Sequence, residues 1–148
     1  MDYRFETFTI LIAKANRCIH RIKSQEMVEY NLKSSHVSCL YYLYRAKSLT
    51  AKELCLLCGE DKANISRAIK HLEKEEYITC KTTAQKRYQS ALLLTEKGKV
   101  VAKELTEKID RILDSVGKDL PEENRKIFYQ SLATICDQLE SICTKYEN

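Results

Sequence analysis

A chain of 148 residues with 44% hydrophobic residues and a formal net charge of +4 is long enough to bury the core of one ordinary domain. A single proline and three glycines leave little room for linkers, so we expect one domain over 1–148. No apolar run approaches the roughly twenty residues of a membrane span. The first residues also lack the layout of a signal peptide, which argues against a secreted or membrane protein and predicts a cytoplasmic one.

Apolar residues near the N-terminus advance by alternating steps of three and four, as in a helix that packs lengthwise along another helix. They are Phe5, Phe8, Ile12, Ala15, Ile19 and Ile22. A second helix is expected from about Ser35 to before Leu49, with Ser34 or Ser35 as its N-cap. Tyr41 and Tyr44 share one face of that helix, which favours a place in the core because aromatic stripes usually serve packing.

A short helix is predicted after Thr50. Thr50 and Glu53 have the spacing of a capping box, in which the side chain of each residue accepts a hydrogen bond from the backbone N–H of the other. Leu54 and Leu57 give this helix a buried edge. Gly59 lies where the chain must turn, since glycine adopts the left-handed conformation at no steric cost.

The next helix is expected to begin at an Asp61 cap and to bury one stripe of apolar residues. The stripe consists of Ile65, Ala68, Ile69 and Leu72. A short helix, a tight turn and a longer helix form a helix-turn-helix unit. The opposite face carries Ala63, Ser66, Arg67, Lys70 and Lys74, with Asn64 and His71 on its flank.

This opposite face has the side chains that a DNA major groove requires. Arg67 can bind both acceptors of a guanine, Asn64 the edge of an adenine, and Ala63 a thymine methyl group. The alternative is a solvated basic helix face without a partner, because charged outer faces are common in themselves.

Two strands are predicted at 77–82 and 89–94, which are rich in β-branched, aromatic and aliphatic residues. They frame a hairpin whose tip, 83–88, is polar and cationic. Such a tip would bury little apolar surface if it folded back on the protein. It is best explained as a wing that contacts phosphate or enters a minor groove.

The distribution of charge supports this location for a DNA site. Between Lys62 and Tyr88 seven lysines and arginines accompany three glutamates, a surplus of four that equals the net charge of the whole chain. Attraction for a polyanion is therefore concentrated on the helix that begins after Asp61 and on the wing. The candidate DNA-binding residues are Lys62, Ala63, Asn64, Ser66, Arg67, Lys70, Lys81, Lys86, Arg87 and Tyr88.

After the wing, Thr95 is expected to cap a helix that Gly117 ends, and Pro121 opens the last helix. The first of these helices carries Val101, Leu105, Ile109, Ile112 and Val116, and the last carries Phe128, Leu132, Ile135, Leu139, Ile142 and Tyr146. Both ends of the chain thus offer apolar seams. Mutual burial across a two-fold axis predicts an isologous homodimer, and packing of the seams within one chain is the alternative.

The seven cysteines are an odd number without an extracellular signature, so we expect reduced thiols. Cys55 and Cys58 have the spacing of a redox or zinc pair, but no second pair follows, and Cys55 is expected to fill a small buried position. His20, His36 and His71 show no spacing that indicates a metal site, and no cofactor is expected.

Four segments, in this order and at this spacing, resemble the MarR family of transcriptional regulators. They are 49–54 (LTAKEL), 61–67 (DKANISR), 72–78 (LEKEEYI) and 94–99 (LTEKGK). The resemblance implies a mainly α fold with a small β-hairpin, a winged helix-turn-helix lobe at 34–99, and dimerisation helices at 1–33 and 100–148. It also implies a homodimeric bacterial or archaeal repressor or activator. The sequence has no nucleophile-base-orienter set, no phosphate loop and no dinucleotide fingerprint, so we do not expect an enzyme.

The resemblance further implies roles for particular residues. The helix that begins near Asp61 would read the major groove and the wing would reach the minor groove, and many such regulators release DNA when a small molecule or oxidant acts on them. A ligand pocket between the dimer arm and the DNA-binding lobe would place Tyr41 and Tyr44 as candidate lining residues. Cys18 lies near the place where some relatives have a sensing cysteine, although burial as a small hydrophobe is favoured.

The wing departs from the family pattern. The family usually has an aspartate, a variable residue and an arginine where this chain has Lys86, Arg87 and Tyr88. The acid that braces the wing arginine is therefore absent, and Arg87, one place early, is the candidate for the minor groove ahead of Tyr88.

Two other classes of protein remain as alternatives. One is a thiol-redox or zinc-dependent protein that uses Cys55 and Cys58, and the other is a winged helix that binds a protein partner. The concentrated cationic surface argues against the second.

Overall fold

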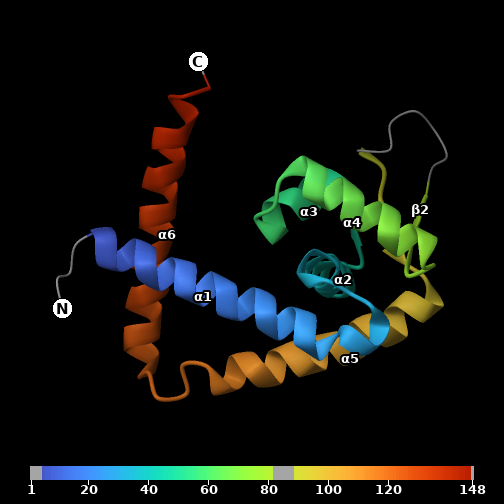
Figure 1. Ribbon diagram of the computed structural model, residues 1–148, viewed down its shortest axis with the longest axis horizontal. Coiled ribbons are helices and arrows are strands. Elements are labelled where there is room, and N and C mark those ends of the chain that lie inside the picture. Colours follow the sequence, from blue (N-terminus) through green and yellow to red (C-terminus); the bar gives the residue numbers. More distant parts are fainter. Residues whose placement is uncertain (1–4, 82–88, 148) are drawn as a thin grey trace. The chain divides into compact units, whose positions relative to one another are not determined.

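The computed structural model describes residues 5–81 and 89–147 (Figure 1), and these form two compact units whose boundary lies between Lys108 and Ile109. The helices are α1 (Phe5–Glu26), α2 (Ser34–Ala46), α3 (Ala51–Cys58), α4 (Lys62–Lys74), α5 (Glu96–Ser115) and α6 (Glu122–Thr144), with a short 3-10 turn, η1 (Val28–Tyr30). The mainly helical winged-helix fold expected from the sequence is confirmed.

The core of the first unit lies where α2, α3 and α4 pack together, and α5 contributes Leu105 to it. Its fully buried side chains include Leu40, Leu43, Leu54, Ile65 and Leu72. Leu57 was expected at the buried edge of α3, but it is 46% exposed. The buried face of α3 is centred on Ala51 and Leu54, and Leu57 lies roughly a quarter of a turn away from its centre. Ile69 is half-buried rather than buried.

The N-cap of α2 is Lys33 and not one of the two serines that the sequence suggested. The Lys33 backbone N–H donates to Nδ1 of His36 at 3.0 Å, so the imidazole takes the place that glutamate usually has in a capping box. Ser34 is instead the first residue of the helix, and its carbonyl accepts a hydrogen bond from the Ser38 hydroxyl.

His36 also stacks on His71 from α4, with ring centroids 4.2 Å apart and planes inclined by 10°. His36 is only 7% exposed. Burial, the neighbouring His71 and the charge of Lys33 together lower the pKa of His36 from 6.5 to about 4. Two histidines that are 35 positions apart in sequence therefore join α2 to α4, and the lowered pKa of His36 keeps its imidazole neutral there.

We expect the free energy of unfolding to fall as the pH drops from 6.5 towards 4. In that interval the unfolded His36 binds a proton and the folded one does not, and the full loss is about 3 kcal/mol. Urea unfolding followed by circular dichroism across the interval measures it. His36→Gln keeps an acceptor for the Lys33 N–H but does not titrate, so its free energy of unfolding should depend less on pH. If the free energies of the two proteins fell in parallel with pH, His36 would not be the group responsible.

The sheet has three antiparallel strands in the order β1-β3-β2, namely β1 (Ser48–Leu49), β2 (Ile78–Cys80) and β3 (Leu92–Leu94). Thr79 pairs with Leu93, and the Lys81 N–H still donates to the carbonyl of Ala91 at 3.1 Å. The hairpin is thus where the sequence placed it, but its strands are shorter than the predicted 77–82 and 89–94. The two-residue β1 was not foreseen, because so short a segment has no periodicity to detect.

The base of the hairpin is joined to the start of α5 by a dense set of hydrogen bonds. The Thr95 hydroxyl caps α5 by accepting from the Gly98 N–H at 2.9 Å, as the sequence predicted, and it donates to the carbonyl of Glu76 at 2.6 Å. The Lys97 ammonium donates to the Glu75 carbonyl at 2.7 Å and lies over the Tyr77 ring. These bonds fix the end of α4, the start of β2 and the first turn of α5 relative to one another.

Other polar contacts hold η1 to α5 within the first unit. The Tyr30 hydroxyl donates to the Glu104 carboxylate, and this hydrogen bond raises the pKa of Tyr30 to about 12. The Lys108 ammonium lies 3.4 Å from the carboxylate of Glu29 and 3.6 Å from that of Glu104.

The predicted apolar seams lie on α1 and α6, and neither helix contains a buried residue. Ile12 and Ile19 of α1 are 41% and 49% exposed, and Phe128 and Ile142 of α6 are 53% and 46% exposed. The dimer that these seams suggest stays a prediction. Within the described part of the chain, no helix combines the length and the apolar character that a membrane span needs.

Candidate nucleic-acid interface

Helix α4 begins at a well-formed cap directly after a tight turn. Gly59 has the left-handed backbone conformation, with φ of 62°, and ends α3. The Asp61 carboxylate then accepts a hydrogen bond from the Asn64 N–H at 2.7 Å. This local chemistry sets where α4 starts, and therefore which of its residues face outward.

Most of the outward candidates that the sequence nominated on α4 lie together on one exposed face. We call it the basic face of α4, and its residues are Lys62, Ala63, Ser66, Arg67, Lys70 and Lys74. Ile65, Ala68 and Leu72 fill the opposite, buried face. The basic face carries four cationic side chains on a helix of 13 residues, which is the arrangement that neutralises phosphates along a groove.

Asn64 and Arg67, the two candidate base readers, are joined by a hydrogen bond. The Arg67 guanidinium donates to Oδ1 of Asn64. The Asn64 amide in turn donates to the carboxylates of Glu60 at 3.1 Å and Asp61 at 3.2 Å. The sequence placed Asn64 and Arg67 separately and missed Glu60, although the three- and four-residue spacings of these partners are those of helix neighbours.

This network determines how the basic face presents its donors. Asn64 uses both its amide group and its carbonyl within the chain. Asn64 must therefore exchange partners before it can bind an adenine edge. The Arg67 guanidinium is exposed and has five N–H donors, of which one points to Asn64. Arg67 is thus held in one orientation while most of its donors still face outward.

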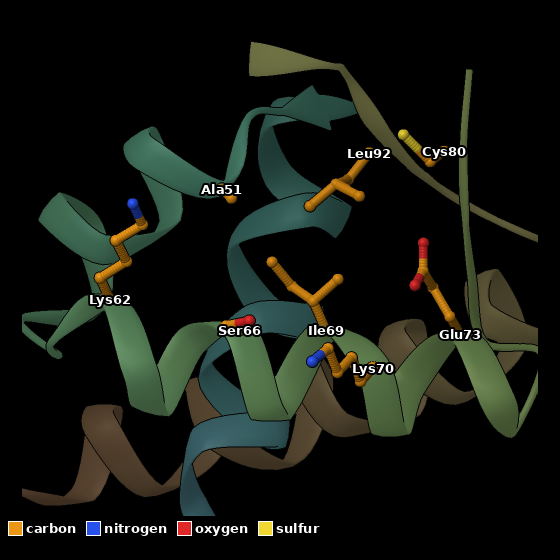
Figure 2. A pocket seen from close by; sticks show the side chains of 8 residues that line it. All are labelled: Ala51, Lys62, Ser66, Ile69, Lys70, Glu73, Cys80 and Leu92. Atoms are coloured by element: carbon orange, nitrogen blue, oxygen red, sulfur yellow. The ribbon is translucent and has the colours of Figure 1, made fainter. Parts of the chain in front are cut away.

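A cavity of about 250 Å³ lies between α4, the start of α3 and the hairpin. Figure 2 shows Ile69 and Leu92 near its centre, with Glu73 and Cys80 towards one end and Lys62 towards the other. Ser66 and Lys70 also line it, so it opens beside the basic face. The half-buried Ile69 is explained by this cavity, because its side chain has no neighbour on that side that fully covers it.

The wing candidates divide into two groups. Lys81 follows β2 directly and is exposed, which agrees with a cationic edge to the hairpin. Lys86, Arg87 and Tyr88 lie outside the described residues, so their roles stay predictions.

The tyrosine candidates for a ligand pocket are not core residues. Tyr41 is half-buried and packs edge-on against Tyr42, with the Arg45 guanidinium over its ring, and Tyr44 is 37% exposed. A place in the core was favoured for both, and the structure corrects this because the face of α2 that packs inward is centred on Leu40 and Leu43. Neither Tyr41 nor Tyr44 is among the residues that line the cavity beside α4.

The cysteine expectations also need correction. Cys18 is exposed on α1 rather than buried, because no residue of α1 is buried. Cys55 is half-buried, and so is Cys58. Over residues 5–81 and 89–147, no group of three or more histidine, cysteine or acidic side chains is placed to hold a metal ion. The zinc alternative at Cys55 and Cys58 is therefore not favoured.

Comparison with known proteins relates this geometry to one family. A model of the MarR family matches residues 30–87, the part that contains α2, α3, α4 and β2. Sequence comparison with curated proteins gives no match.

Solved structures match most of the chain. A MarR family regulator from Neisseria meningitidis has a TM-score of 0.76 at 21% identity and covers 91% of this chain and 95% of its own. The MepR protein of S. aureus, solved in complex with DNA, has a TM-score of 0.77 at 18% identity and covers 89% and 97%. A MarR protein from Peptoclostridium difficile has a TM-score of 0.79 at 17% identity and covers 95% and 92%. At these identities the likeness establishes a shared fold.

Proposed function

We propose that this chain is a transcriptional regulator that binds double-stranded DNA sequence-specifically. Its resemblance to the MarR family is confirmed by the family model and by the shared fold. The observation that carries the proposal is the basic face of α4, which is exposed and cationic and lies opposite the buried stripe of the same helix. In this proposal α4 enters the major groove. The hairpin after β2 contacts the minor groove or its phosphates, with Arg87 as the inserted side chain.

The proposal includes a homodimer built from the apolar seams of α1 and α6. A dimer presents two copies of α4, and a spacing of about 34 Å between them selects an inverted repeat. A small molecule or an oxidant that changes this spacing weakens DNA binding, which makes the protein a switchable repressor. The exposed Ile12 and Phe128 support burial of both seams against a second copy.

Fluorescence anisotropy tests the proposal. The purified protein is titrated into labelled duplex from the region upstream of its own gene and into scrambled duplex, each over a series of salt concentrations. We expect tighter binding to the native duplex, two chains per site and a steep fall of affinity with salt. Salt-independent binding, or no binding to either duplex at low salt, would overturn the proposal and favour a protein partner.

Lys86 is expected to act on all DNA sequences alike. Lys86→Ala should weaken binding to native and scrambled duplex by a similar factor and should reduce the salt slope by about one unit, because one phosphate contact is lost. Lys118→Ala is a matched control, since Lys118 is an exposed lysine of the second unit. If Lys86→Ala changed the ratio of the affinities for native and scrambled duplex, Lys86 would not be a simple phosphate contact.

A further inference from the structure

The side chain of Glu60 lies at the inner end of a series of hydrogen bonds that reaches the surface of α4. Glu60 precedes the helix and is half-buried, Asn64 on the first turn is half-buried, and Arg67 on the second turn is exposed. The Asn64 amide donates to Oε2 of Glu60 at 3.1 Å, and the Arg67 guanidinium donates to Oδ1 of Asn64. Glu60 is thus connected to Arg67 through one intermediate side chain.

The partners of Asn64 determine the orientation of its amide. The amide nitrogen donates to two carboxylates, Oε2 of Glu60 at 3.1 Å and Oδ2 of Asp61 at 3.2 Å. In the reversed orientation the amide oxygen would face these carboxylates and the amide nitrogen would face the Arg67 guanidinium. Acceptor would then meet acceptor, and donor would meet donor. The two acids therefore turn the oxygen of Asn64 towards Arg67.

The two acids differ in what else they do. Asp61 also caps α4, because its Oδ1 accepts a hydrogen bond from the Asn64 backbone N–H at 2.7 Å. The Glu60 side chain can be changed while this cap stays in place. The backbone N–H of Glu60 donates to the Cys55 carbonyl at 3.2 Å, and a side-chain substitution leaves that bond intact. The effect of Glu60 on Arg67 can therefore be measured separately from the start of the helix.

The hydrogen bond to Asn64 leaves Arg67 able to bind a guanine. A guanidinium has two edges that each present a pair of parallel N–H donors, Nε with Nη2 and Nη1 with Nη2. The bond to Asn64 uses one hydrogen of Nη2, and the two hydrogens of Nη2 belong to different edges. One complete edge is thus left for the O6 and N7 acceptors of guanine. A guanidinium that is already oriented also loses less entropy on binding.

We infer that Glu60 is a positioning residue for base recognition: through Asn64 it holds the Arg67 guanidinium in the orientation that binds a guanine of the DNA half-site. The inference rests on the proposed function, because it takes α4 as the helix that enters the major groove.

Substitution of Glu60 should change the base preference without weakening the general attraction for DNA. Glu60→Ala should lower the preference for native over scrambled duplex by roughly two- to tenfold, because Arg67 must then be ordered during binding. Its affinity for scrambled duplex should not fall, since loss of a carboxylate does not reduce attraction to phosphate. Glu107→Ala is the matched control, since Glu107 is an exposed glutamate of α5. A Glu60→Ala protein with the preference of the wild type would overturn the inference.

Glu60→Gln separates positioning from charge. Glutamine keeps an oxygen that accepts from the Asn64 amide, so this variant should retain the preference of the wild type. The Glu60 charge also acts on α1, because burial lowers the pKa of Lys23 and the Glu60 carboxylate opposes that effect. Both substitutions remove the charge, but only alanine removes the acceptor. If Glu60→Gln lost as much preference as Glu60→Ala, the effect would come from charge and the positioning role would be wrong.

A double-mutant cycle tests whether Glu60 acts through Asn64. Asn64→Ala should itself reduce the preference for native duplex, and adding Glu60→Ala to it should reduce the preference no further. Additive losses would mean that Glu60 acts by another route, which contradicts the inference.

A measurement without DNA distinguishes failure of this inference from failure of the proposed function. The heteronuclear NOE of the Arg67 Nε–H, identified by its absence in Arg67→Lys, reports motion of the guanidinium on the picosecond to nanosecond timescale. We expect a rigid guanidinium in the wild type and Glu60→Gln, and a mobile one in Glu60→Ala. Equal rigidity in all three would overturn the inference even if the wild type strongly preferred native duplex. A wild type that bound both duplexes alike would instead overturn the proposed function, and with it any role of Glu60 in base recognition.

Discussion

Gly98→Ala is expected to lower the free energy of unfolding of the first unit by about 3 kcal/mol or more. A Cβ atom at this position would lie 1.9 Å from the carbonyl oxygen of Tyr77 and 2.8 Å from its carbonyl carbon. Both are backbone atoms, so no side-chain rotation relieves the overlap. The first turn of α5 must move away from β2, and the hydrogen bonds that Thr95 makes with the Glu76 carbonyl and the Gly98 N–H are strained or lost.

Urea unfolding at a fixed protein concentration measures this effect, with Gly59→Ala as the control. A Cβ at Gly59 would meet nothing within 4 Å, so only its left-handed backbone, with φ of +62°, opposes the alanine. That strain costs about 1 kcal/mol. Gly98→Ala should therefore be clearly the less stable of the two variants. A smaller loss for Gly98→Ala than for Gly59→Ala would mean that the hairpin base adjusts more easily than its hydrogen bonds suggest.

The features that the sequence predicted correctly are those with local causes. The Thr50–Glu53 capping box, the Asp61 cap and the Thr95 cap all form as expected, since each depends on side chains that bond within three residues. The basic face of α4 was also predictable, because a fixed helical period places its residues once the buried stripe is known.

The features that the sequence missed depend on contacts between distant segments. The His36–His71 stack joins two helices, and no spacing in the chain indicates such a contact. The need for glycine at position 98 likewise arises from a carbonyl in a different element. The hydrogen bonds of Asn64 with Arg67 and Glu60 did have a usable signal, namely the three- and four-residue spacings of helix neighbours.

Arg67→Ala is expected to have the largest effect on recognition of a specific DNA site. If Arg67 binds both acceptors of a guanine, its loss weakens binding to the native duplex by about 1–3 kcal/mol, which raises Kd roughly five- to 150-fold. It also relaxes the base preference at one position of each half-site. The exposed guanidinium that Asn64 already orients supports this assignment, because an ordered side chain loses less entropy on binding.

Charge and geometry at this position are separated by a second substitution. Arg67→Lys keeps the positive charge but cannot present two parallel N–H donors, so it should bind scrambled duplex like the wild type and still lose the base preference. Lys74→Ala removes one charge from the last turn of α4 and should weaken binding to the native and the scrambled duplex by a similar factor. Anisotropy with duplexes that differ at single positions distinguishes these patterns. If Arg67→Lys retained both the affinity and the preference of the wild type, Arg67 would be a phosphate contact, and base reading by α4 would have to lie with Asn64, Ser66 or Ala63.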